Sequence, residues 1–370
     1  MSNYAPNSEP DQTLRTSVLR QVVGFTLIEL LIVMAIIALL SAALLVALTE
    51  LQATSKKRRC QQQIKKIDQL IMQRWDEILN KPVPIRFNSL GPTPLKVNIH
   101  ARKLQILIAR RELMRLQMPD RITDITDNPV VFPGIPDNPV AFPVQMQLPA
   151  TTATFRRKAT DNAALGNTWS PLNQGAECLY LILSVMQDRD SSAIDFFFPS
   201  EIGDTDNDGM LEILDGFNQP IGFLRWAPGI SSFSDIQAVN AFDSPDATDM
   251  GAADYRLFDT NPSNDAFNLF PLIMSAGRDG LFGTYGFGAN SVAGFHYKST
   301  VVTAGTAFSL EYEYLREALE TATGSPSAFP YDPYVRHADS NTEGFPYTFG
   351  AFVDDGMTDN ISNHQIEVNP

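Results

Sequence analysis

The chain has 370 residues, of which 44% are hydrophobic, and a net charge of −14. Residues 1–158 carry 21 Lys and Arg against 12 Asp and Glu, a balance of +9, whereas residues 159–370 carry 7 against 30, a balance of −23. Because so acidic a C-terminal part repels phosphate backbones, we expect no nucleic acid among its partners and favour cations or basic proteins. Only two cysteines are present, Cys60 and Cys178, so a disulfide framework is excluded.

An apolar segment dominates the N-terminal part. Residues 25–48 read FTLIELLIVMAIIALLSAALLVAL, without proline or glycine. As a helix they extend about 36 Å, enough to cross a hydrocarbon core of about 30 Å. The small residues at 41–43 suggest a removed signal peptide as an alternative, but the apolar region of such a peptide is only about 7–15 residues long. The sequence therefore predicts a membrane-spanning helix.

One ionisable residue, Glu29, lies in this segment, where it is costly unless it is neutralised, paired or close to the headgroups. Residues 24–29 read GFTLIE, after a polar leader and before the apolar run. This pattern resembles the cleavage signature of type IV prepilins and pseudopilins. The resemblance implies that a membrane aspartyl peptidase cuts after Gly24 and that Phe25 becomes the N-methylated terminus. It also implies that Glu29 pairs with the terminal amine of a neighbouring subunit.

The same resemblance implies partners and a location. The partners are the prepilin peptidase, other pilin or pseudopilin subunits, an inner-membrane assembly platform with its ATPase, and membrane lipid. We expect a single pass through the inner membrane, the N-terminus in the cytoplasm and the head in the periplasm, and a filament after assembly. Two features depart from this pattern: the leader 1–24 is neutral where family leaders are usually net basic, and the basic run 56–59 favours the opposite orientation.

After the anchor, apolar residues recur mostly every three or four positions, which predicts an amphipathic helix that ends near Asn80. These positions are Leu51, Cys60, Ile64, Ile67, Ile71, Trp75 and Ile78. We expect an α+β protein, with one long N-terminal helix whose first half spans the membrane and whose second half packs on a head. The head would contain a small antiparallel sheet and extended loops. The predicted divisions are a leader 1–24, the long helix 25–80 with its transmembrane segment 25–48, a helix and proline-rich linker 81–160, and an acidic α+β head 161–370.

The region 81–160 contains one further predicted helix, at about Ile99 to Met118, which carries several arginines. Their charges would contact lipid headgroups or an acidic neighbour, or form a solvated face. Residues 127–133 and 137–143 read DNPVVFP and DNPVAFP, a local duplication. We interpret 120–160 as an extended, exposed loop or linker.

In the head, the sequence predicts a helix over 174–187 and strands over 211–214, 221–226 and 272–275. Between them, residues 204–209 read DTDNDG, and Asp215 is the twelfth residue counted from Asp204. This spacing of Asp204, Asp206, Asp208 and Asp215 matches the oxygen ligands of an EF-hand-like calcium loop, except that Asp replaces the usual last Glu. An acidic turn without metal is the alternative.

Two later segments resemble those of the major pseudopilins of type II secretion. Residues 215–220 read DGFNQP, which is similar to their Asp-Pro-Trp-Gly-Asn-Pro segment, although Phe217 replaces Trp and Asn218 replaces Gly. Residues 275–284 read SAGRDGLFGT and are similar to their Ser-x-Gly-x-Asp-Gly-x-x-Gly-Thr segment. Because that family uses calcium in its C-terminal loops, the resemblance adds Asp279 to the candidate ligands. Two glycine-rich turns are the alternative.

The functional hypothesis is a structural subunit of a type II secretion pseudopilus or type IV pilus-like filament. The alternative is a monomeric membrane-anchored ligand-binding protein or enzyme with a periplasmic head. We predict no enzymatic activity, because the four histidines lack metal-ligand spacing and the one Ser-x-Gly-x-Asp stretch is no nucleophile elbow. Calcium is the only cofactor that the residues suggest.

Overall fold

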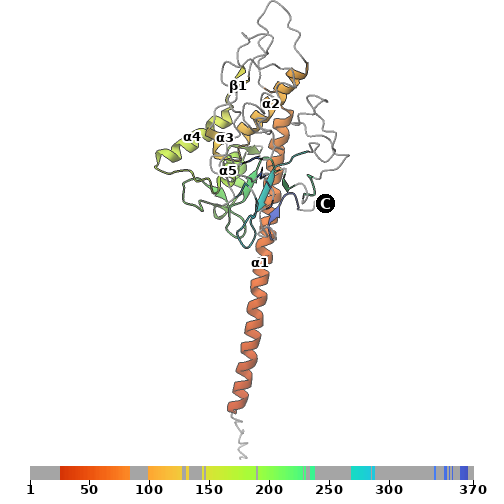
Figure 1. Cartoon of the computed structure of the whole chain (residues 1–370). Helices are drawn as coiled ribbons and strands as arrows, with labels where there is room; N and C mark the ends of the chain where they lie inside the picture. Colours follow the sequence, from red (N-terminus) through yellow and green to blue (C-terminus); the bar gives the residue numbers. More distant parts are fainter. Residues whose placement is uncertain are drawn as a thin grey trace, which may run out of the picture. The chain divides into compact units, whose positions relative to one another are not determined.

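A computed structural model gives the fold, and Figure 1 shows the whole chain. The residues it describes are 26–83, 99–126, 131–132, 144–145, 147–188, 191–227, 229–230, 234–237, 268–284, 286–287, 337–338, 346–347, 350, 352 and 359–365. The chain divides into two compact units, Met1–Gln52 and Ala53–Pro370.

The first helix, α1 (Leu27–Asn80, 54 residues), contributes to both units and confirms the predicted long helix. In the first unit its large apolar side chains are exposed: Leu27 is 82% exposed, and those that follow it up to Leu48 remain at least 43% exposed. It is the one helix among the described residues that is long and apolar enough to cross a membrane. The predicted anchor is thus a helix whose apolar surface the described residues leave uncovered.

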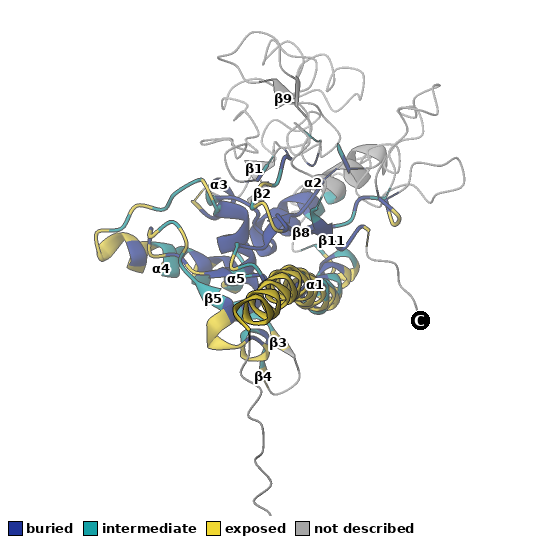
Figure 2. Cartoon of the chain, turned by 90° about the horizontal axis from the view of Figure 1, so that it is seen from below, coloured by how far each residue is buried: buried dark blue, intermediate teal, exposed yellow. Residues whose placement is uncertain are grey.

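The part of α1 in the second unit has the opposite character. Cys60, Ile64, Ile67, Ile71 and Ile78 are each 0% exposed, as the three- and four-residue spacing predicts. They join one core with the apolar face of α5 (Gln174–Val185) and with inner residues of the sheet. Figure 2 shows exposed residues along the coils of α1 and buried residues concentrated around α5 and β8.

The other α-helices of the described residues are α2 (Ile99–Gln117), α3 (Ile122–Thr126) and α4 (Ala150–Ala164). Two short 3₁₀ helices, η1 (Ala193–Phe196) and η2 (Pro199–Glu201), follow α5. The helices predicted at 99–118 and 174–187 are therefore present.

The central sheet has three antiparallel strands in the order β11 (Ile361–Ser362), β8 (Leu272–Ser275), β7 (Gly222–Leu224). Phe223 faces Ile273 across the ladder, and both are fully buried. The remaining strands form two-stranded antiparallel pairs: β1 (Val131–Phe132) with β2 (Val144–Gln145), β3 (Gln187–Asp188) with β4 (Ser191–Ser192), β5 (Ile202–Gly203) with β6 (Glu212–Ile213), and β9 (His337–Ala338) with β10 (Pro346–Tyr347). The structure confirms the α+β class with small antiparallel sheets.

Two arginines of α2, Arg111 and Arg115, are not the exposed charges that the sequence suggested. Arg111 is 0% exposed and Arg115 1%. Arg115 donates to the buried Glu112, with its Nη2 2.7 Å from Oε1. Arg225, next to β7, pairs in the same way with Asp124, at 2.7 Å between Nη1 and Oδ2. Arg115 and Arg225 thus bind acidic partners inside the second unit, and Arg111 is buried there with them, so Arg111 and Arg115 form no solvated face.

The interpretation of 120–160 as an extended, exposed loop is wrong for the described part of this range. Asp120, just before α3, and Asp124, on α3, are buried, and α4 begins at Ala150. The side chain of Thr152 donates to the backbone oxygen of Leu116, and Phe155 joins the core. Arginine partners and a few buried contacts hold these residues in place, and a proline-rich composition does not reveal such contacts.

Candidate functional site

The first candidate site is the start of α1, where Thr26 and Glu29 form a capping box. The backbone N–H and the hydroxyl of Thr26 donate to Oε2 of Glu29 at 2.9 and 2.8 Å. The backbone N–H of Glu29 donates to Oγ1 of Thr26 at 3.2 Å. This reciprocal pattern satisfies helix N–H groups that have no partner in the preceding turn. It fixes the Glu29 carboxylate on the first turn of the apolar helix.

The sequence predicted a role for Glu29, whereas the capping role of Thr26 emerges from the structure. The pattern Thr-x-x-Glu before an apolar run is a recognisable capping signal, so the sequence contained the information. Gly24 and Phe25, the predicted processing residues, lie outside the described residues.

The second candidate site is the acidic loop between β5 and β6. The Asp204 carboxylate accepts hydrogen bonds from the backbone N–H groups of Asp208 at 3.2 Å and Gly209 at 2.9 Å. Asn207 and Gly209 have φ of 58° and 88°, the left-handed region that Asn tolerates and Gly prefers. The loop therefore turns sharply around Asp204. One oxygen each of Asp204, Asp206 and Asp208 lies within 4.8 Å of the other two.

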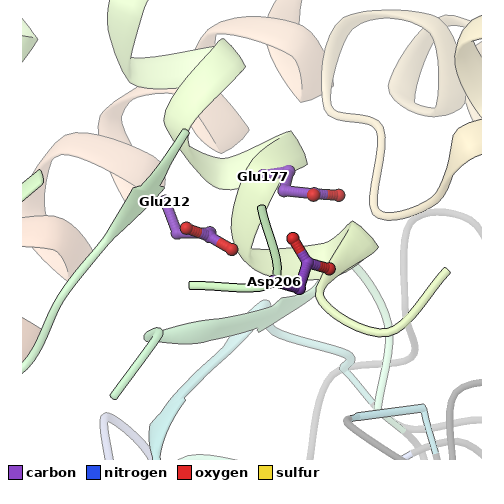
Figure 3. Close-up of side chains that lie close together, drawn as sticks. All are labelled: Glu177, Asp206 and Glu212. Carbon is purple, nitrogen blue, oxygen red and sulfur yellow. The ribbon is translucent and has the colours of Figure 1, made fainter. Parts of the chain in front are cut away.

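Asp206 also belongs to a second, deeper group with Glu177 and Glu212, whose oxygens lie within 4.8 Å of one another as well. Glu177 comes from the first turn of α5 and Glu212 from β6, and Figure 3 shows the Asp206 carboxylate directed towards Glu177. Glu177 and Glu212 are both 0% exposed. Three carboxylates from a helix, a loop and a strand thus converge in the interior.

The three carboxylates of this group differ in how many hydrogen bonds they accept. Glu212 accepts from the backbone N–H and the hydroxyl of Thr205, at 3.0 and 3.1 Å. Oε2 of Glu177 accepts from the indole N–H of Trp169. Oε1 of Glu177 is buried and has no hydrogen-bond partner among the described residues. Both carboxylate oxygens of Asp206 are buried as well, with the Ser170 side chain as a donor to this carboxylate.

Burial disfavours the charged form of these carboxyls. It raises the pKa of Glu177 to about 10, and the charges of Asp208 and Asp206 act in the same direction. It also raises the pKa of Glu212 to about 7. The pKa of Asp206 is raised by burial and by the neighbouring Asp208. Each proton or cation in this group therefore relieves repulsion between like charges.

The structure does not bring Asp215 or Asp279 into either acidic group. Oδ1 of Asp215 accepts from the backbone N–H groups of Phe217 and Gln219 at 2.7 and 2.9 Å, and Oδ2 accepts from the Ser275 hydroxyl at 2.5 Å. Asp215 therefore holds the turn before β7 against β8. Asp279 accepts from the backbone N–H of Leu281 at 2.8 Å.

Glu177 and Glu212, by contrast, were not among the ligands predicted from the sequence. Glu177 lies in a segment whose helical pattern indicates core. Glu212 is the ninth residue counted from Asp204, an EF-hand position that often binds calcium through water, so its spacing was the one available signal. No sequence signal connects Glu177 with the loop, because only the packing of α5 on β6 brings them together.

Comparison with known proteins bears on the first candidate site. Residues 24–45 match the family model of the prokaryotic N-terminal methylation motif, a stretch that includes Gly24, Phe25 and Glu29. Neither a curated protein nor a solved structure matches the chain significantly. The N-terminal segment is thus that of a type IV pilin-like, prepilin-type protein. The motif implies processing by a peptidase and assembly with other pilin subunits.

Proposed function

We propose that this chain is a structural subunit of a type II secretion pseudopilus or type IV pilus-like filament, processed after Gly24 and assembled through its N-terminal helix. The observation that carries this proposal is a long helix with an uncovered apolar surface, whose first turn holds a single carboxylate, Glu29, within the matched motif. We propose a structural rather than a catalytic role.

The physical argument concerns how this helix is covered. An apolar surface of this length is stable in lipid or against other apolar helices, and its length suits a bilayer. Cleavage after Gly24 would leave an ammonium group four residues before Glu29. A carboxylate and an ammonium in an apolar medium favour pairing, because each is costly alone. Pairing between two subunits would also set their relative position along the filament.

The proposal includes a location and a set of partners. The N-terminal helix fits membrane anchoring. We place the N-terminus in the cytoplasm and the head in the periplasm, with assembly by an inner-membrane platform and its ATPase. The prepilin peptidase would cut the leader and methylate Phe25.

Three substitutions at the start of α1 separate pairing from helix capping. Glu29→Gln keeps a side chain that can complete the capping box but removes the charge. Glu29→Ala removes both, and Thr26→Ala removes the cap hydroxyl but keeps the charge. We expect both Glu29 variants to be cleaved and inserted yet to fail in assembly, while Thr26→Ala assembles. The measurement is the yield of sheared filaments or crosslinked oligomers beside the amount of processed chain in the membrane.

The matched control is Glu50→Gln, which removes a carboxylate from the same helix outside the apolar run, and it should assemble normally. Assembly of Glu29→Gln at the wild-type level would contradict the pairing role and leave Glu29 as a cap only. If neither the wild type nor any variant forms oligomers, the alternative of a monomeric membrane-anchored protein would be favoured.

A further inference from the structure

We propose that Glu177, Asp206 and Glu212, with Asp208 beside them, form a binding site for a divalent calcium ion inside the head. This site differs from the loop that the sequence predicted, because its ligands come from three elements. It goes beyond the assembly role and stands independently of it.

An unpartnered buried oxygen points to a ligand at this position. Glu177 is 0% exposed, and its Oε1 has no hydrogen-bond partner among the described residues. Both carboxylate oxygens of Asp206 are buried beside it, with the Ser170 side chain as a donor to this carboxylate. Leaving a buried polar atom unsatisfied costs free energy, and crowding several carboxylates adds repulsion. A cation among these oxygens removes both costs at once.

The type of cation follows from the ligand chemistry. The group offers only carboxylate oxygens, which suit hard cations rather than metals that prefer thiolate or imidazole. Calcium binds oxygen at about 2.3–2.6 Å, so two ligands on opposite sides of it lie roughly 4.6–5.2 Å apart. Oxygens within 4.8 Å of one another fit around one such ion. Magnesium needs a tighter octahedron at about 2.0–2.1 Å and loses its water less readily.

The neighbouring acidic residues divide into those available and those already occupied. Asp204 accepts two backbone N–H groups, which shape the loop. Asp208 is 6% exposed, and its carboxylate accepts from the backbone N–H groups of Met210 and Ser170. A carboxylate oxygen has a second lone pair, so Asp208 can still contribute to the ion. Asp215 is held by Ser275 and by its own turn.

A bound ion would join the start of α5 to the β5–β6 hairpin. Glu177 belongs to a helix that packs in the main core, whereas Asp206 lies on a partly exposed loop. An ion that binds only the folded state raises the free energy of unfolding of the head. The increase grows with the ratio of the free ion concentration to the dissociation constant. Calcium would therefore stabilise the head and order this loop.

The test uses the full chain in detergent, stripped with chelator and titrated with calcium or magnesium alone. We expect one calcium per chain by equilibrium dialysis. At about 100 times the dissociation constant, we also expect a rise of roughly 5 °C or more in the melting temperature of the head. Asp206→Asn and Glu177→Gln should lose most of this rise. Asp206→Asn alters a partly exposed loop residue, so it tests the site even where Glu177→Gln fails to fold.

Two control variants complete the design. Asp161→Asn removes one exposed carboxylate from α4 and should keep the full response. Asp279→Asn removes the ligand suggested by the pseudopilin resemblance and should also keep it. An unchanged melting temperature in saturating calcium would overturn the proposal. Protons would then neutralise the carboxylates of Glu177, Asp206 and Glu212. A calcium response that survives in Asp206→Asn or disappears in Asp279→Asn would also overturn the proposal.

Discussion

The described part of the first unit, residues 26–52, and the second unit, Ala53–Pro370, use the same helix α1 in opposite ways. In the first, Ile37 is 57% exposed and its large apolar neighbours are exposed with it. In the second, Ile67 is 0% exposed, and even Arg115 and Arg225 are buried with acidic partners. The described residues of the second unit cover one another, whereas those of the first leave their large apolar side chains exposed. Substitutions in the two units should therefore affect different measurements.

The largest effect on stability should come from Arg225→Met. The change leaves the buried carboxylates of Asp120 and Asp124 without this partner, and breaking a buried pair from one side costs about 3–5 kcal/mol. Denaturant unfolding of the full chain in detergent, followed by tryptophan fluorescence, measures the loss. The exposed Arg58→Met serves as control, and a loss of the same size in both variants would contradict the internal role of Arg225.

A somewhat smaller effect is expected for Ile67→Ala in the buried stripe of α1. Removing these carbon atoms from a packed core should lower the free energy of unfolding by about 2–5 kcal/mol. Ile37→Ala, the same change in the exposed half, should leave unfolding of the head unchanged and act only on assembly. Equal destabilisation by the two variants, in the same unfolding assay, would remove the contrast between the units.

The smallest effect is a pH dependence that arises from His364. Its Nε2–H donates to the backbone oxygen of Pro271 at 3.0 Å, and its Nδ1 accepts from the Ser234 hydroxyl at 2.8 Å. Burial lowers the pKa of His364 to about 4, below its ordinary value of 6.5, so the folded chain holds it neutral. The contribution of neutral His364 to the free energy of unfolding is fully present above pH 6.5 and is lost as the pH falls towards 4. Between pH 7 and 5 the loss should be about 2 kcal/mol.

Comparison of the wild type with His364→Gln isolates this contribution. The raised pKa values of Asp124 and Glu212 act in the opposite direction, since their folded forms gain protons as the pH falls. These carboxyls are present in both proteins, so they cancel in the difference. A wild type and variant that lose equal stability from pH 7 to 5 would show that His364 is not held neutral.

The sequence predicted the elements that have a clear local signal. The apolar run, the three- and four-residue stripe and the pattern of 174–187 gave α1 and α5 closely, and the apolar run at 272–275 gave β8. The sequence did not predict α4, because Phe155 is the only large apolar residue of this helix and no periodic pattern indicates it. The sequence also placed Arg111 and Arg115 on a surface. The partner of Arg115, Glu112, lies on the same helix, but the burial of both depends on tertiary packing that the sequence pattern does not reveal.

The candidate sites show the same limit. The position of Glu29 follows from a contiguous motif and needs no tertiary information. The acidic group does not, because Glu177 lies 27 residues before Asp204 in the chain and joins the loop only through the packing of α5. Counting twelve residues from Asp204 selected Asp215, but strand β6 intervenes and carries Glu212 to the group instead.

The most direct test of the assembly account is intact-mass and N-terminal peptide mass spectrometry of the chain purified from its native membranes. The account predicts a chain that begins at Phe25, with one methyl group on its terminal nitrogen. A chain that still begins at Met1, or one cut near Ala43 or beyond, would contradict it.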